Sequence, residues 1–358
     1  MRRIAYLLAV LMLLCAVSFL VAACGEETTT TTQAAAPSTT VVTATQLAVT
    51  DMAGRTVQIP AEINSIATFG AIGVLNAMVE TMGCGDKILN QMSANFTKTD
   101  QWKYQYVFAP QIKDGPLFEN ANREIQIEEV LKAAPDISFC MTKETATLLE
   151  GKGLPVVYLE WKDLDDIPTC INLLGEVLGK QDVAADYLKW FDEKVALAEG
   201  LAAKILEADR KTVLYGSITS YTQPHIIAEW WIPEAGGISV TKDRPSDAES
   251  YEYTAEDLLA WNPDVMVTSS GKMAGEIKAD TRLAQITAVV DSAIYKIPTV
   301  AHVWGNRTPE QPLTILWLMN KLYPEIMPTE ALAKEIGDFY SRFFKTDLTS
   351  EQITEIIG

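Results

Sequence analysis

Residues 128–136 read EEVLKAAPD, and residues 256–264 read EDLLAWNPD. In both stretches a glutamate stands seven residues before a Pro-Asp pair, and an apolar run follows. Proline ends a helix, and a short apolar run after it favours a strand, so each stretch predicts a short helix that leads into a buried strand. This recurrence predicts two lobes built on one design.

The rest of the chain predicts the same class of fold. Short apolar runs alternate with helical patterns in both halves, which is typical of βα units with parallel sheets. The expected strands are residues 65–69, 137–139, 156–159, 212–215, 265–268 and 297–301. The predicted fold class is therefore α/β, with an N-terminal lobe over residues 46–178 and a C-terminal lobe over residues 210–358.

A long amphipathic segment connects the two predicted lobes. Its apolar residues recur at spacings of three and four between about residues 181 and 208, a pattern that indicates a helix. At 1.5 Å per residue such a helix spans about 42 Å, more than one small lobe. We therefore expect residues 179–209 to form one long backbone helix that joins the lobes; the alternative is a helix within one lobe.

The N-terminus has the features of an export signal. Arg2 and Arg3 precede an apolar stretch from residue 4 to residue 21, and residues 20–24 read LVAAC. This ending resembles a bacterial lipobox, in which Cys24 becomes the lipidated first residue after removal of the signal peptide, residues 1–23. A plain secretory signal and an uncleaved anchor are the alternatives. The Thr-rich residues 24–45 are expected to be a flexible tether, which would hold the protein outside the cell on the outer face of the cytoplasmic membrane.

Composition and motifs exclude several functions. The 358 residues include 29 Lys and Arg against 47 Asp and Glu, a net charge of −18, which argues against nucleic-acid binding. The sequence contains no HExxH, GxSxG, GxxxxGK[ST] or GxGxxG motif, so we expect no enzyme, although an exported hydrolase and a lipoprotein adhesin or sensor remain alternatives. Two histidines cannot supply a histidine-rich metal site. Cys84, Cys140 and Cys170 are expected to be buried thiols, with a bridge between two of them as the alternative.

Several segments together resemble a known family. Residues 49–60, VTDMAGRTVQIP, look like the opening hairpin of the helical-backbone (class III) substrate-binding proteins of ABC importers, which capture ferric siderophores, haem or vitamin B12. The two Glu-to-Pro-Asp stretches, residues 234–237 (EAGG) and residues 343–352 (FFKTDLTSEQ) resemble the same family. The resemblance covers residues 47–358 in order. It implies two Rossmann-like lobes with parallel sheets, a rigid connecting helix and a ligand cleft between the lobes.

The same resemblance implies a function and partners. The expected protein is a monomer without a cofactor that captures an iron chelate of the siderophore type and delivers it to an ABC permease with its cytoplasmic ATPase. Cobalamin, haem or an oxyanion such as molybdate are the alternative cargoes. Glu128 and Glu256 match glutamates that dock into basic pockets of the permease in the vitamin B12 system. The alternative is that both carboxylates are simply stabilised at helix N-termini.

Candidate ligand residues follow from the rule that open α/β sheets bind ligands beyond the carboxyl ends of their strands. Trp304 and Arg307 are the first choices, because an aromatic face and a fixed cation suit a large anionic chelate. The full set of candidates is Phe69, Gly70, Arg123, Tyr221, His225, Trp231, His302, Trp304, Asn306 and Arg307. Gly70 has the alternative of serving its turn alone, and one of Trp230 and Trp231 is expected in the core. Loops 114–123, 217–225 and 302–308 are expected to order around the ligand, with little rotation between the lobes.

Overall fold

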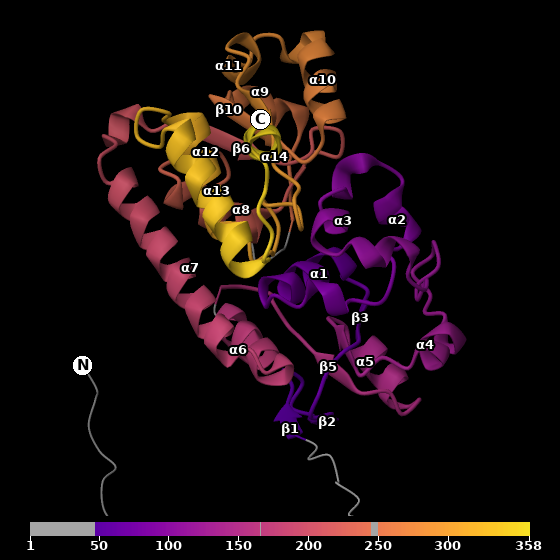
Figure 1. Ribbon diagram of the computed structural model, residues 1–358. Helices are drawn as coiled ribbons and strands as arrows, with labels where there is room; N and C mark the ends of the chain where they lie inside the picture. Colours follow the sequence, from indigo (N-terminus) through magenta and orange to yellow (C-terminus); the bar gives the residue numbers. More distant parts are fainter. Residues whose placement is uncertain (1–46, 165, 245–249) are drawn as a thin grey trace, which may run out of the picture. The chain divides into compact units, whose positions relative to one another are not determined.

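The computed structural model describes residues 47–164, 166–244 and 250–358, and it confirms an α/β fold with parallel sheets (Figure 1). In the N-terminal lobe, β3 (Ile66–Phe69), β4 (Ile137–Cys140) and β5 (Val156–Tyr158) pair in parallel in that order. In the C-terminal lobe, the parallel order is β11 (Ile294–Lys296), β10 (Val265–Thr268), β6 (Thr212–Tyr215) and β8 (Ile238–Ser239). The signal peptide and tether predicted for residues 1–45 lie outside the described residues.

Helices surround both sheets. Those of the first half are α1 (Ile72–Thr81), α2 (Ala94–Thr97), α3 (Gln105–Phe108), α4 (Ile127–Ala133), α5 (Lys143–Glu150) and α6 (Asp166–Leu178), followed by α7 (Gln181–Ala202). Those of the second half are α8 (His225–Glu234), α9 (Ala255–Trp261), α10 (Gly271–Ala279), α11 (Thr287–Val290), α12 (Gln311–Leu322), α13 (Thr329–Phe343) and α14 (Ser350–Ile357). Short 3₁₀ helices are η1 (Gly85–Lys87), η2 (Asp100–Trp102), η3 (Pro110–Asp114), η4 (Glu207–Asp209) and η5 (Thr281–Leu283). None of the helices that the structure describes is long and apolar enough to cross a membrane.

Two antiparallel pairs complete the architecture. Strand β1 (Leu47–Thr50) pairs with β2 (Thr56–Ile59), so the hairpin expected over residues 49–60 is present. Strand β7 (Thr222–Gln223) pairs with β9 (Tyr251–Glu252) in the second half. The cysteines of the described residues, Cys84, Cys140 and Cys170, are buried and form no disulfide with one another.

The internal repeat takes the same form in both lobes. Helices α4 and α9 each end at a left-handed residue, Ala134 with φ 47° and Asn262 with φ 43°, just before the Pro-Asp pair. The Asp136 carboxylate then accepts hydrogen bonds from the backbone N–H groups of residues 64 and 65, which lead into β3. The Asp264 carboxylate accepts from the N–H and hydroxyl of Thr212, which begins β6. Each repeat therefore fastens its own strand to the neighbouring strand of the same sheet.

One expected strand is wrong. The apolar residues 297–301 form no strand, and the fourth strand of the sheet is β11, three residues earlier. Residues 297–301 are instead a buried loop. An apolar run indicates burial, and a buried loop and a buried strand can both have such a run. This loop leads directly to the segment that contains His302 and Arg307.

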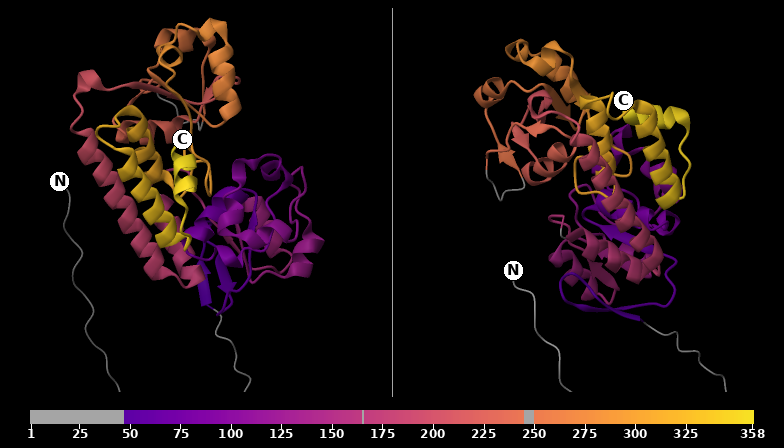
Figure 2. Two further views of the ribbon diagram at one scale, coloured as in Figure 1. Left: turned by 45° about the horizontal axis from the view of Figure 1, so that its top comes forward. Right: turned by 90° about the vertical axis from the view of Figure 1, so that its left-hand side faces the viewer.

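Helix α7 is the connecting element, and it runs along α13 (Figures 1 and 2). The Trp190 ring lies 4.6 Å from the Phe339 ring, and the Tyr187 hydroxyl donates to the Pro309 carbonyl at 2.9 Å. Lys194 pairs with Glu335 at 2.7 Å. The helix ends at Ala202, although the apolar pattern continues to Leu206, because the chain turns there and leaves Leu206 exposed.

Candidate ligand-binding cleft

A cavity of about 820 Å³ lies between the two lobes. From the N-terminal lobe it is lined by the residues that directly follow β3, β4 and β5, including Ala71, Thr142 and Glu160. From the C-terminal lobe it is lined by Thr222 and by the segment that follows the buried loop 297–301. The cleft therefore lies where parallel α/β sheets bind ligands, beyond the carboxyl ends of the strands.

The turn between β3 and α1 presents backbone N–H groups to this cleft. Gly70 adopts φ 79°, which only glycine adopts without strain, and no side chain caps the N-terminus of α1. Uncapped N–H groups and the helix dipole make such a terminus favourable for an anion. Gly73 lies in the first turn of α1, where a Cβ atom would come within 2.9 Å of Cδ2 of His302. The first turn of α1 is thus in close contact with the opposite lobe.

The segment with the C-terminal ligand candidates is organised by one buried carboxylate. Glu310 Oε1 accepts from the Ala301 N–H at 2.9 Å and from the Trp304 indole N–H at 3.0 Å. Its Oε2 accepts from the His302 N–H at 2.8 Å and from the Thr308 hydroxyl at 2.8 Å, and the Tyr340 hydroxyl also donates to Oε1. Burial raises the pKa of Glu310, an effect that these hydrogen bonds oppose. Glu310 therefore sets the conformation of residues 301–308.

Cationic side chains enter the cleft from both lobes. Arg307 is half-buried, and its Nε donates to the backbone carbonyl of Lys162 across the lobes at 3.3 Å. Arg123 is exposed at the wall of the cleft, in a loop where its φ is 65°. Lys162 also lines the cleft and pairs with Glu160. The cleft thus offers guanidinium groups and backbone N–H groups, which are donors suited to an anion.

His302 contributes a neutral ring. Its side chain packs beside Trp102, with 5.2 Å between the ring centroids, and Nδ1 is buried without a hydrogen-bond partner in the described part of the chain. Burial lowers the pKa of His302 to about 4. The imidazole is therefore uncharged at neutral pH, with one ring nitrogen as a donor and the other as an acceptor.

The structure places half of the predicted ligand residues at this cleft. Gly70, Arg123, His302, Asn306 and Arg307 all line it. Tyr221 does not line it; its ring packs edge-on against Tyr253, while its neighbour Thr222 reaches the cleft. His225 begins α8, and its side chain is outside the described residues.

Three predicted ligand residues are corrected, because Phe69, Trp231 and Trp304 are fully buried core residues. Phe69 stacks on Phe118 at 5.8 Å, and Trp231 packs against Tyr215 at 5.1 Å. The Trp304 indole N–H donates a hydrogen bond to the Glu310 carboxylate, and Trp304 does not line the cleft. Of the neighbouring tryptophans, Trp231 is the one in the core, and Trp230 is half-buried.

Sequence reasoning missed important residues of the cleft. Trp161 and Lys162 follow the strand expected at residues 156–159, so the strand-end rule would have found them. Glu119 lies within the loop 114–123, where only Arg123 was singled out. Nothing in the sequence marked Ile226 and Ile227 as cleft residues, since their pattern is that of any buried helix.

The cleft continues into an apolar side pocket of about 330 Å³. Trp161 and Leu164 line it from one lobe, Ile226 and Trp230 from the other, and Arg307 stands at both cavities. Trp230 stacks on Phe191 of α7, with 5.9 Å between the rings and an interplanar angle of 7°. The side pocket thus offers aromatic surface next to a cation.

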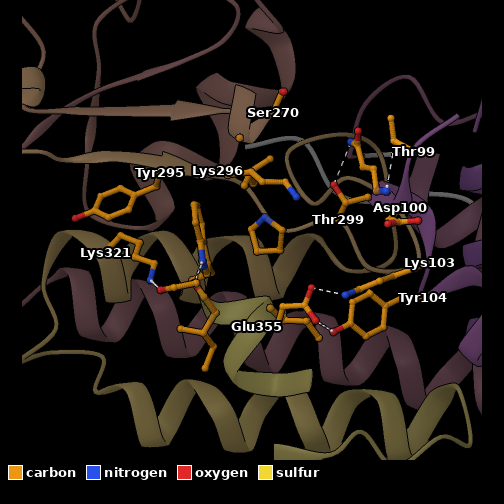
Figure 3. Close-up of a pocket in the computed structure, with 18 of the residues that line it drawn as sticks. Thr99, Asp100, Lys103, Tyr104, Ser270, Tyr295, Lys296, Thr299, Lys321 and Glu355 are labelled. Atoms are coloured by element: carbon orange, nitrogen blue, oxygen red, sulfur yellow. Dashed lines mark hydrogen bonds and ion pairs between the residues drawn. The ribbon is translucent and has the colours of Figure 1, made fainter. Parts of the chain in front are cut away.

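A second cavity of about 600 Å³ also lies between the lobes and shares no described residue with the cleft (Figure 3). Lys103 and the Tyr104 hydroxyl both reach Glu355 of α14, as Figure 3 shows. Gln101 donates to Thr299 at 3.4 Å. Among the described residues, no predicted ligand residue lines this cavity, and the side chains of Lys103, Tyr104 and Gln101 join the two lobes.

Two further expectations concern surfaces and metals. Glu128 and Glu256 are both exposed in the first turns of the equivalent helices α4 and α9. No group of three or more His, Cys, Asp or Glu side chains that could hold a metal ion occurs in residues 47–164, 166–244 and 250–358.

The two-lobed α/β architecture with a cleft between the lobes is that of a periplasmic solute-binding protein whose structure is known. Residues 85–301 match the model of the periplasmic binding protein family. The chain belongs to this family, in the class III group, and the family works outside the cytoplasm.

Individual relatives support the fold over nearly the whole chain. The molybdate-binding protein MolA of Haemophilus influenzae is 23% identical over 336 residues, 83% of this chain and 91% of MolA. The structure of MolA bound to molybdate superposes with a TM-score of 0.72 at 21% identity, covering 85% of this chain and 99% of MolA. A periplasmic solute-binding protein of Veillonella parvula has a TM-score of 0.76 at 24% identity, covering 87% of this chain and 97% of that protein.

Proposed function

We propose that this protein captures a small metal oxyanion, such as molybdate, outside the cell and delivers it to an ABC permease with its cytoplasmic ATPase. The observation that carries the proposal is the uncapped N-terminus of α1, which opens into a cleft lined by Arg123 from one lobe and Arg307 from the other. Backbone N–H groups and two guanidinium groups bind the oxygens of an anion by charge-assisted hydrogen bonds. The likeness to a molybdate-binding protein supports the same cargo.

A second cargo is an anionic iron chelate of the siderophore type, the first choice of the sequence analysis. The specific observation in its favour is the size of the site, about 820 Å³ for the cleft and a further 330 Å³ for the side pocket between Trp161 and Trp230. Organic arms of a chelate would bury apolar surface there, whereas a bare oxyanion would leave this surface exposed.

Purified residues 46–358 decide between the two cargoes. Thermal unfolding and calorimetry are measured with molybdate, tungstate, sulfate and phosphate, and with ferric catecholate, ferric hydroxamate and ferric citrate. A cargo present at 100 times its Kd should stabilise the protein by about 2.7 kcal/mol. Stabilisation by molybdate or tungstate alone supports the oxyanion, and stabilisation by a ferric chelate alone supports the chelate. No stabilisation by any of these anions contradicts the proposal.

Delivery is predicted to depend on Glu128 and Glu256. Glu128→Arg and Glu256→Arg should leave cargo affinity near wild type, because both side chains are exposed and neither lines the cleft. Uptake by cells that carry the cognate permease should fall for each variant and further for the double variant, since the charge reversal turns attraction into repulsion. Glu62→Arg, at another exposed site, is the control. Wild-type uptake by the double variant would show that both residues only stabilise their helix N-termini.

The lipid anchor at Cys24 is a separate proposal, based on the lipobox-like residues 20–24. Cys24→Ser should release the protein from the membrane or leave an unprocessed precursor. Cargo affinity should not change, because every described residue that lines the cleft belongs to the folded body. Fractionation and mass spectrometry of the N-terminus give the answer, and a processed, membrane-bound variant would contradict lipidation.

A further inference from the structure

Glu119 is an acidic residue at the wall of a cleft whose other features favour anions. Its side chain is only 3% exposed. Oε1 accepts a hydrogen bond from the Gly70 N–H, while Oε2 is buried and meets no donor in the part of the chain that the structure describes. A buried carboxylate oxygen without a donor is unfavourable when the group is ionised. An anion bound at the nearby N-terminus of α1 would add like-charge repulsion.

The groups around Glu119 make its carboxyl group the one in the cleft whose protonation state we expect to change with pH. Arg123 on its own loop acts on it through its charge, and Gly70 faces it from the β3–α1 turn. Burial raises the pKa of Glu119, and the Gly70 hydrogen bond and the Arg123 charge reduce this effect. Burial also lowers the pKa of His302 to about 4 and raises the pKa of Tyr158, so both stay neutral between pH 5 and 9. Among the residues that the structure describes, the other charged groups at the cleft are the Glu160–Lys162 pair and Arg307.

We propose that Glu119 is a specificity-determining residue of the cleft, whose carboxyl group takes up one proton from solvent when a fully ionised anion is captured. The inference rests on the proposed function, that the cargo is an anion. Protonated Glu119 places no negative charge beside the bound anion. Ionised Glu119 repels molybdate or sulfate, but it can accept a hydrogen bond from an anion that carries its own proton, such as monohydrogen phosphate.

The direction of the pH dependence follows from this coupling. A raised pKa means that Glu119 is protonated at low pH and loses its proton as the pH rises above the ordinary glutamate range. Affinity for molybdate should therefore decrease as the pH rises, by roughly 100-fold once Glu119 is ionised, given the strength of charge interactions near a protein surface. Monohydrogen phosphate should not show this decrease.

The test uses calorimetry with molybdate from pH 5 to pH 9, in pairs of buffers that differ in ionisation enthalpy. Wild-type protein should bind more weakly at high pH, and its proton uptake should approach one per anion only between the Glu119 pKa of the free protein and the higher Glu119 pKa of the loaded protein. Glu119→Gln is neutral at all pH values and retains an acceptor for Gly70. It should lose the pH dependence and bind molybdate more tightly than wild type at pH 8.5. Glu124→Gln is the matched control on the same loop, because Glu124 is exposed and lies outside the cleft.

The possible results separate this inference from the proposed function. Molybdate binding without proton uptake by the wild type, or an unchanged pH profile in Glu119→Gln, would overturn the role of Glu119 and leave anion capture intact. The uptake measurement needs no variant, so poor folding of Glu119→Gln cannot hide a negative result. If no anion of the panel binds the wild type at any pH, the proposed function itself fails, and the role of Glu119 fails with it.

Discussion

Glu310→Ala should lower the free energy of unfolding by about 4 kcal/mol, because several buried donors lose their acceptor at once. The carboxylate accepts from the N–H groups of Ala301 and His302, from the Trp304 indole, and from two hydroxyl groups. Each buried donor left without a partner costs about 1–3 kcal/mol, and partial relaxation of the loop reduces the sum. Denaturant unfolding monitored by tryptophan fluorescence measures the change.

The same variant should also impair capture of the cargo. Residues 301–308 depend on Glu310 for their conformation, and Asn306 and Arg307 are presented to the cleft from this segment. Glu62→Ala, which removes an exposed carboxylate, should change the stability by less than about 0.5 kcal/mol. A loss below 1 kcal/mol in Glu310→Ala would mean that water or a rearranged loop satisfies these donors, and that Glu310 does not organise the segment.

Replacing both cleft arginines should have the largest effect on binding. Arg123→Ala and Arg307→Ala should each weaken binding of an anionic cargo by about 1.5–3 kcal/mol, the range for a hydrogen bond to a charged group. The two residues line the cleft from opposite lobes, and two losses of at least about 1.5 kcal/mol each would lower the affinity of the double variant by more than about 100-fold. Calorimetry with the best anion of the panel measures this loss, which should diminish at high ionic strength.

The control for charge alone is Arg282→Ala. Arg282 is exposed, pairs with Asp280 and lies outside the cleft, so its loss should leave the Kd within twofold of wild type. Equal losses in Arg282→Ala and the cleft variants would show that only the net charge of the protein matters. Wild-type affinity in the double cleft variant would place the cargo elsewhere.

Sequence patterns were sufficient for the fold, because the features that carry it are local. The Pro-Asp pairs at residues 135–136 and 263–264 mark the end of a helix and the start of a strand in both lobes, and this much can be read from neighbouring residues alone. The hydrogen bonds of Asp136 and Asp264 to strands 71 and 52 residues earlier could not be read in this way. The strand expected at residues 297–301 was wrong because strand pairing depends on residues that are distant in the sequence. An apolar run indicates that its residues are buried, but it does not indicate which residues pair with a neighbouring strand.

The site was less predictable because its decisive contacts join distant residues. Trp304 stands in a segment rich in ligand candidates, yet its indole binds Glu310 in the core. Glu119 is held at the cleft by a hydrogen bond from the N–H of Gly70, which is 49 residues away in the sequence. A single glutamate in a polar loop does not indicate such a contact. Gly70 and Arg307 were predictable, because the strand-end rule depends on topology and not on particular contacts.

The length of α7 has a mechanical consequence for unloading. Its 22 residues make a rod of about 33 Å, so a tilt of about 5° at one end moves the other end by about 3 Å. A displacement of that size equals the length of one hydrogen bond, such as the Arg307 contact that spans the lobes. If a permease docks on both lobes as proposed, a tilt of this size would be enough to break the Arg307 contact without the unfolding of a hinge.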